Sequence, residues 1–148
     1  MAKKTYFLLR QVLIIIIVIV VIGVISLPKL VKFNQRRMRI SEAKAVLETI
    51  RDYEEVYRGQ FDKYIACSAN PSTVPQAQKA SWDVENQTGW QDIGFELSNG
   101  TYYQYEVVTS MDGFTFTAYA RSDLDGDGIM SEISLDQDGV WSMHRQFE

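Results

Sequence analysis

The chain has 148 residues, 46% of them hydrophobic, which is enough for one domain with a core and a distinct terminal segment. Its formal charge of −4 is unevenly divided: residues 1–39 carry eight basic groups and no acid, whereas the rest carries seven basic and 19 acidic groups, a formal −12. Phosphate would repel so acidic a domain, which excludes a nucleic-acid reader and favours a basic, membrane-proximal arm on an acidic domain.

The first predicted element is an apolar helix. Residues 12–27 contain no charge and are mostly Val and Ile, and residues 7–9 extend the apolar character toward the amino end. As a helix this run spans about 24 Å, or about 30 Å from Phe7, which is long enough to cross a bilayer. A removable secretory signal has a shorter apolar region, although Val24 and Ser26 fit its cleavage pattern. Five basic residues follow the run and three precede its core, so a positive-inside count alone would place the large domain in the cytoplasm, and composition leaves the orientation open.

Beyond Pro28 the helical pattern continues and becomes amphipathic. Charged residues separate apolar residues that recur every three or four positions. These apolar positions are Leu30, Phe33, Ile40, Ala43, Val46, Leu47, Ile50, Tyr53 and Tyr57. We expect the helix to end near Gly59 and to pack its apolar face on a domain. Gly23 and Pro28 are its weak points, because one lacks a side chain and the other an amide donor.

A loop and a small sheet are predicted for the remainder. Residues 67–81 are rich in proline and small polar residues, which indicates a loop. Residues 101–122 and 131–144 alternate with period two about Asp-Gly turns, which predicts two hairpins. The apolar face of such a sheet needs a cover, and the second half of the helix supplies one. The predicted fold is α+β: a long amino-terminal transmembrane and amphipathic helix packed on a small antiparallel sheet.

Together these features resemble the type IV pilins and type II secretion pseudopilins. The resemblance rests on the short basic leader, the apolar helix that begins at Phe7, Pro28 twenty-one residues later, SEAKAVLETI on the following helix, and the late DLDGDG beside strands. It covers most of the chain and is most specific over residues 7–60. It implies a leader at residues 1–6, a transmembrane and polymerisation half-helix at 7–33, and a pilin-like head at 34–148.

The resemblance also implies a function, which is structural and not enzymatic. Members of the family are inserted in the bacterial inner membrane with the head outside the cytoplasm, cleaved by a prepilin peptidase, and polymerised through their apolar helices at an inner-membrane assembly platform. The implied partners are other copies of the chain and related pilin subunits, in an extracellular or periplasmic filament. The residues expected to carry assembly are Phe7, Gln11, Ile16, Val20, Gly23 and Pro28.

The processing site departs from the family pattern at two positions. The family has glycine before the cleavage site and glutamate at the fifth residue after it, where this chain has Tyr6 and Gln11. Cleavage before Phe7 would create a charged amine in an apolar filament core, and the glutamate of a neighbouring subunit usually neutralises it. Because an unpaired buried charge is costly, the joint loss of both residues is consistent with an uncleaved chain. An unprocessed pilin-like protein, a divergent or minor subunit, and a subunit whose peptidase tolerates Tyr6 all stay open. Of these we predict an uncleaved amino terminus, to be tested by intact mass.

Residues 123–132, DLDGDGIMSE, form the other motif. Three aspartates at alternate positions followed by glycine match the opening of a calcium-binding loop. The match then fails, because the bidentate acid would fall at Ser134 and Glu132 is two residues early. Calcium, which the family resemblance also implies, and a solvated Asp/Gly turn both stay open. The candidate ligands are Asp123, Asp125, Asp127, the carbonyl of Ile129, and Glu132.

A second class of function is a monomeric single-span anchor that presents a binding domain outside the cell. Ligand binding by such a protein would survive removal of the helix, whereas a filament subunit loses its function with its helix. Catalysis has little support in the sequence. His144 is the only histidine and Cys67 the only cysteine, and no zinc, phosphate-loop or Ser/His/Asp pattern surrounds either residue.

Overall fold

A computed structural model describes residues 2–83, 85 and 87–144, with the side chains of all of these except residues 2–10 and 23–33. The chain divides into two compact units, Met1–Met38 and Arg39–Glu148, the second of which we call the head. Helix α1 (Ala2–Phe61) remains helical at Gly23 and Pro28, so the predicted continuation beyond the proline is confirmed. Among the residues searched, which are those the structure describes, no helix has the length and hydropathy needed to span a bilayer.

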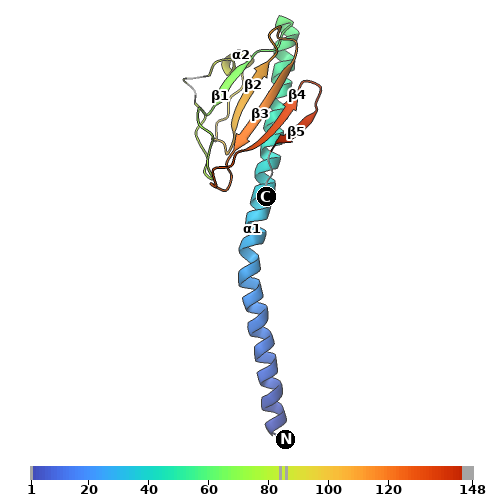
Figure 1. Ribbon diagram of the computed structural model, residues 1–148, viewed down its shortest axis with the longest axis vertical. Helices are drawn as coiled ribbons and strands as arrows, with labels where there is room; N and C mark the ends of the chain where they lie inside the picture. The colour runs from blue at the N-terminus through green and yellow to red at the C-terminus, as the bar shows by residue number, and fades with distance from the viewer. Residues whose placement is uncertain (1, 84, 86, 145–148) are drawn as a thin grey trace. The chain divides into compact units, whose positions relative to one another are not determined.

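The head contains one antiparallel sheet of five strands in the order β1-β2-β3-β4-β5, so each strand pairs with its sequence neighbours (Figure 1). Both predicted hairpins are present: β2 (Gln104–Thr109) pairs with β3 (Phe116–Ser122), and β4 (Ser131–Asp136) pairs with β5 (Trp141–His144). Strands β3 and β4 pair as well, which joins the hairpins into one meander. The α+β class is therefore confirmed.

Two short elements lie where the sequence predicted only loop or gave no prediction. Strand β1 (Cys67–Asn70) pairs with β2 at the edge of the sheet, with an irregular register between Cys67 and Asn70. Helix α2 (Trp90–Ile93) is a single turn that buries Trp90 and Ile93. Neither sequence shows a clear period, because four residues are too few and the CSAN strand lacks the β-branched and aromatic residues that mark strands.

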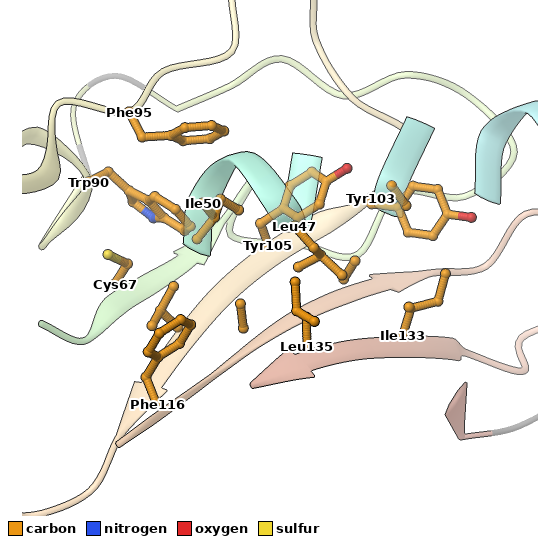
Figure 2. Packing of buried hydrophobic residues seen from close by; sticks show 14 of the residues in the cluster. Leu47, Ile50, Cys67, Trp90, Phe95, Tyr103, Tyr105, Phe116, Ile133 and Leu135 are labelled. Atoms are coloured by element: carbon orange, nitrogen blue, oxygen red, sulfur yellow. The ribbon is translucent and has the colours of Figure 1, made fainter. Parts of the chain in front are cut away.

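The core of the head lies between α1 and one face of the sheet, and side chains from both meet there (Figure 2). Leu47 and Ile50 of α1 are fully buried, as the three- and four-residue spacing predicted. Ala118 and Ala120 on the central strand β3 are also fully buried, and their small side chains leave room for the larger residues of the helix. The prediction fails at Tyr53, which is 39% exposed and has its ring edge against Phe95.

Candidate functional site

The first candidate functional surface is the apolar segment of α1, which we define as residues 11–22. Each of residues 12–22 is Val, Leu or Ile, and each is between 47 and 63% exposed. Because successive residues of a helix are about 100° apart, these eleven side chains surround the helix axis and leave no polar face. A helix that is apolar all round is typically covered by lipid or by other helices.

The predicted assembly residues fall partly within this segment. Three of them lie in it and are exposed: Gln11, Ile16 and Val20. The other predicted processing and assembly positions lie outside the residues whose side chains the structure describes: Tyr6, Phe7, Gly23 and Pro28. The structure therefore describes the exposure of three of the six predicted assembly residues. The processing site stays a prediction from the sequence.

The second candidate site is the aspartate loop, residues 123–130, between β3 and β4. One carboxylate oxygen from each of Asp123, Asp125 and Asp127 lies within 4.8 Å of the others. Asp123 is buried, and its Oδ1 accepts hydrogen bonds from the backbone amides of Gly126 (2.7 Å) and Asp127 (3.2 Å). Its Oδ2 accepts a third from Gly128 at 3.0 Å. Asp123 thus organises the loop, while Asp125 and Asp127 are exposed at the rim.

The other predicted ligands take different positions. Glu132 lies on β4, where its Oε2 accepts a 2.7 Å hydrogen bond from Nε of Arg121, and it is not in the group of converging carboxylates. The same guanidinium donates from its other branch to Glu106. The amide of Ile129 donates to Asp127 Oδ1 at 2.7 Å, and the Ile129 side chain is exposed. Three of the four predicted carboxylate ligands are therefore brought together, and the carbonyl of Ile129 stays a prediction.

The chemistry of the loop fits calcium in donor type but not in number. Carboxylates are the hard oxygen donors that calcium prefers, and three negative groups in this space favour a cation. Calcium takes about six to eight oxygens, however, so three aspartates would need several backbone carbonyls or waters as well. The Asp123 carboxylate accepts three amide hydrogen bonds, and these bonds are sufficient to hold the loop as a polar turn without a metal ion.

The outer face of the sheet forms a shallow hollow of about 280 Å³ across β3, β4 and β5. His144 lies there directly across the strand pair from Glu132, whose carboxylate Arg121 already holds. A second hollow, of about 450 Å³, opens beside Trp82, and residues 79–81 and 96–100 line the rest of it. Both hollows are open surfaces with mixed polar lining. Among the residues that the structure describes, neither hollow places an uncommitted acid beside His144.

Glu54 is a buried carboxyl that our sequence analysis did not identify. It is fully buried on the head-facing side of α1, four residues after Ile50 and seven after Leu47, which continues the apolar stripe. Burial raises the pKa of Glu54 from 4.5 to about 7, although hydrogen bonds from the Ile65 amide and the Cys67 thiol act in the opposite direction. Its spacing from Leu47 and Ile50 predicts that position 54 is buried, whereas a glutamate is usually found on the surface.

Comparisons with known proteins add no relative to this description. No protein-family model, curated protein or solved structure gives a significant match to the chain. The functional argument consequently rests on the residues of this chain and their arrangement.

Proposed function

We propose that the protein is a structural subunit of a type IV pilus or of a type II secretion pseudopilus-like filament, and that it assembles through the apolar segment of α1. The observation that carries the proposal is that residues 12–22 expose apolar side chains on all sides of the helix. The head adds a second observation, because the same helix continues as the element that covers its sheet. A filament subunit needs both parts: a helix that other subunits bury, and a domain fixed to that helix.

The free energy involved explains why the segment needs a cover. At about 1 kcal/mol for each half-exposed apolar side chain, eleven side chains represent roughly 10 kcal/mol in water, which equals the whole stability of a typical domain. Lipid provides that cover before assembly, and the corresponding helices of other subunits provide it in the filament. Inside the membrane the gain comes from close helix packing, since lipid tails are as apolar as leucine.

The proposal includes a location and a set of partners. The head lies outside the cytoplasm, the helix is held in the bacterial inner membrane before assembly, and the filament is extracellular or periplasmic. The partners are copies of this chain, related subunits and the inner-membrane assembly platform. Calcium at the aspartate loop would stiffen the β3–β4 end of the sheet. The amino terminus stays uncleaved, because Tyr6 and Gln11 replace the residues on which processing and charge neutralisation depend.

The proposal is tested by placing a charge in the apolar segment. Ile16→Asp puts a carboxylate on a side chain that is 52% exposed, and a charge in the middle of an apolar bundle costs several kcal/mol. Val140→Asp is the matched control, because Val140 is 59% exposed in the turn between β4 and β5 of the head. We expect filaments in sheared cell-surface material from the wild type and from Val140→Asp, and none from Ile16→Asp.

Two further readouts separate the proposal from the single-span anchor. Circular dichroism of the purified variants should show the same head melting temperature in both, so that lost filaments are not lost folding. Normal filaments from Ile16→Asp would overturn the proposal. Wild-type protein that is never found in filaments, while a ligand binds the head equally well after removal of the apolar segment, would favour the anchor.

A further inference from the structure

The structure assigns to Glu54 the role of a proton-controlled latch: its protonated carboxyl ties α1 to the edge strand β1, and its ionisation loosens the segment of residues 62–70. We propose this as a device of the head itself, which goes beyond filament assembly and does not depend on it. The argument rests on the burial of Glu54, on the two groups it contacts, and on the weakness of the strand that it holds.

The contacts of Glu54 join the end of α1 to the start of β1. Its Oε2 accepts a hydrogen bond from the amide of Ile65 at 3.1 Å, and the thiol of Cys67 lies 3.7 Å from its Oε1. Ile65 precedes β1, and Cys67 is the first residue of β1. Glu54 and Cys67 expose 0% and 1% of their surfaces, so water does not compete for these contacts. The carboxyl is therefore a buried polar link between the last turns of α1 and the start of β1, in addition to the hydrogen bond that the Tyr64 hydroxyl donates to Glu55.

No positive charge is in contact with the Glu54 carboxyl in the part of the chain that the structure describes. From α1 the nearest ionisable group is Glu55, a like charge, which accepts a hydrogen bond from Tyr64 and lies 3.9 Å from Arg58. From β1 it is the Cys67 thiol, whose own pKa is raised by burial, by Glu54 and by the charge of Asp92 on α2. Ionisation thus places among buried groups a negative charge that only the Ile65 amide and the Cys67 thiol stabilise, and the cost of burying the charge exceeds the gain from these two hydrogen bonds.

The direction of the pH effect follows from the raised pKa. Below pH 4.5 the carboxyl is protonated in both the closed and the open segment, and the latch is at full strength. Between pH 4.5 and about 7 the opened segment releases its proton first, so closure weakens as the pH rises. Above about 7 the loss is complete, and it amounts to roughly two orders of magnitude in the closing equilibrium.

Strand β1 is the element that yields when Glu54 ionises. It has four residues, carries an irregular register between Cys67 and Asn70, and has β2 as its one neighbouring strand. Its other edge is held by loop residues and not by a strand: the Ser68 amide donates to the Thr88 carbonyl at 2.9 Å, and Trp90 Nε1 donates to the Ser68 carbonyl at 2.6 Å. Short edge strands open at a smaller free energy than central strands, so the carboxylate gains water by local opening before the whole head unfolds. Opening also uncovers Cys67, the only cysteine, which makes its thiol a reporter at the proposed hinge.

The experiment measures the reaction of Cys67 in the full-length protein with a small disulfide reagent between pH 5 and pH 9. Each rate is divided by that of an unstructured peptide thiol, which removes the pH dependence of thiolate formation. We expect the protection of Cys67 in the wild type to fall by more than tenfold between pH 5 and pH 8. Glu54→Gln keeps the size and one of the two acceptor oxygens but cannot ionise, and its protection should be independent of pH. Glu48→Gln changes an exposed glutamate of the same helix that is not among the groups acting on Glu54, and it should keep the wild-type profile.

A second measurement uses only the wild-type protein, so it tests the latch even if Glu54→Gln does not fold. Titration of the glutamate side-chain carboxyl carbons of the wild type by NMR should show one carboxyl with a midpoint near pH 7. Protection that is flat with pH in the wild type, a wild-type profile in folded Glu54→Gln, or glutamates that all titrate near pH 4.5 would each overturn the latch. None of these readouts involves filaments, so the latch and the proposed function fail separately.

Discussion

The two stretches of α1 whose side chains the structure describes present apolar residues in opposite ways. In residues 39–61 they recur every three or four positions, and Leu47 and Ile50 are fully buried in the head. In residues 12–22 every side chain is apolar and every one is exposed. A helical period thus marks burial within the chain, whereas an unbroken apolar run indicates burial against lipid or other chains.

The largest change in head stability is expected when a buried aliphatic residue of α1 is truncated, and an exposed aliphatic residue of the same helix is the control. Leu47→Ala removes a fully buried side chain and should destabilise the head by about 2–5 kcal/mol. Ile19→Ala is the matched change at a position that is 63% exposed, and it should leave the thermal unfolding of the head unchanged. Circular dichroism melts of full-length protein in mild detergent give both values. Equal losses would remove the distinction between the two stretches.

The next effect tests how closely the head is packed beside the strand that Glu54 holds. Gly89 has a φ of +85°, and a Cβ there would lie 2.3 Å from the carbonyl oxygen of Ala66. Gly126 has a φ of +75° and open space around it. Gly126→Ala should cost about 1 kcal/mol for its backbone conformation alone, and Gly89→Ala should cost at least about 1 kcal/mol more. Urea unfolding would measure the difference, and similar losses at both glycines would mean that residues 66 and 89 yield easily.

A smaller effect belongs to the outer face of the sheet, where polar residues replace the apolar ones of the core. Arg121 donates to both Glu106 and Glu132, and about a quarter of each of these side chains is exposed. Arg121→Met leaves two half-buried carboxylates without their cation and should destabilise the head by about 1 kcal/mol at low salt. The loss should shrink in 1 M salt, which screens the remaining repulsion. A loss that salt does not change would assign the role of Arg121 to packing of its stem.

The smallest effect concerns the aspartate loop. If calcium binds with millimolar affinity, 10 mM calcium should stabilise the head by about 1 kcal/mol and raise its melting temperature by a few degrees. Asp125→Asn is the informative variant, because Asp125 is exposed at the rim while Asp123 also holds the loop backbone. The variant should fold normally and lose the calcium response. Identical melts of the wild type with calcium and with chelator would leave the loop as a polar turn.

Much of this fold could be predicted because the informative elements are long and strongly periodic. The continuous helix, both hairpins and the cover of the sheet by α1 follow from residue spacing alone. Strand β1 could not be predicted, because four residues with an irregular register carry no period and the pairing with β2 is fixed by tertiary contacts. Tyr53 fits the three- and four-residue spacing yet is 39% exposed, whereas Glu54, which our sequence analysis did not identify, is fully buried. At this point of the helix the residue types do not indicate which side chain faces the head.

The candidate sites were predictable to different degrees for the same reason. Asp123, Asp125 and Asp127 are close in sequence, so the turn that the glycines permit brings their carboxylates together. Glu132 lies on the next strand, and cross-strand pairing gives its carboxylate to Arg121. Arg121 lies opposite Glu132 because of the register between β3 and β4. The spacing of acidic residues along the sequence does not predict that register.

The order of the strands has a consequence for how the head folds. Strands β2 to β5 follow one another with short connections, so each new pairing closes a small loop and can form early. Strand β1 is separated from β2 by 33 residues. Closing this longer loop costs more entropy before the β1–β2 hydrogen bonds can stabilise the pair. We therefore expect the four-strand meander to form first on α1 and the β1 edge to dock last. A nascent chain would then expose the free edge of β2 during its final folding step, which makes that edge the place where aggregation during synthesis begins.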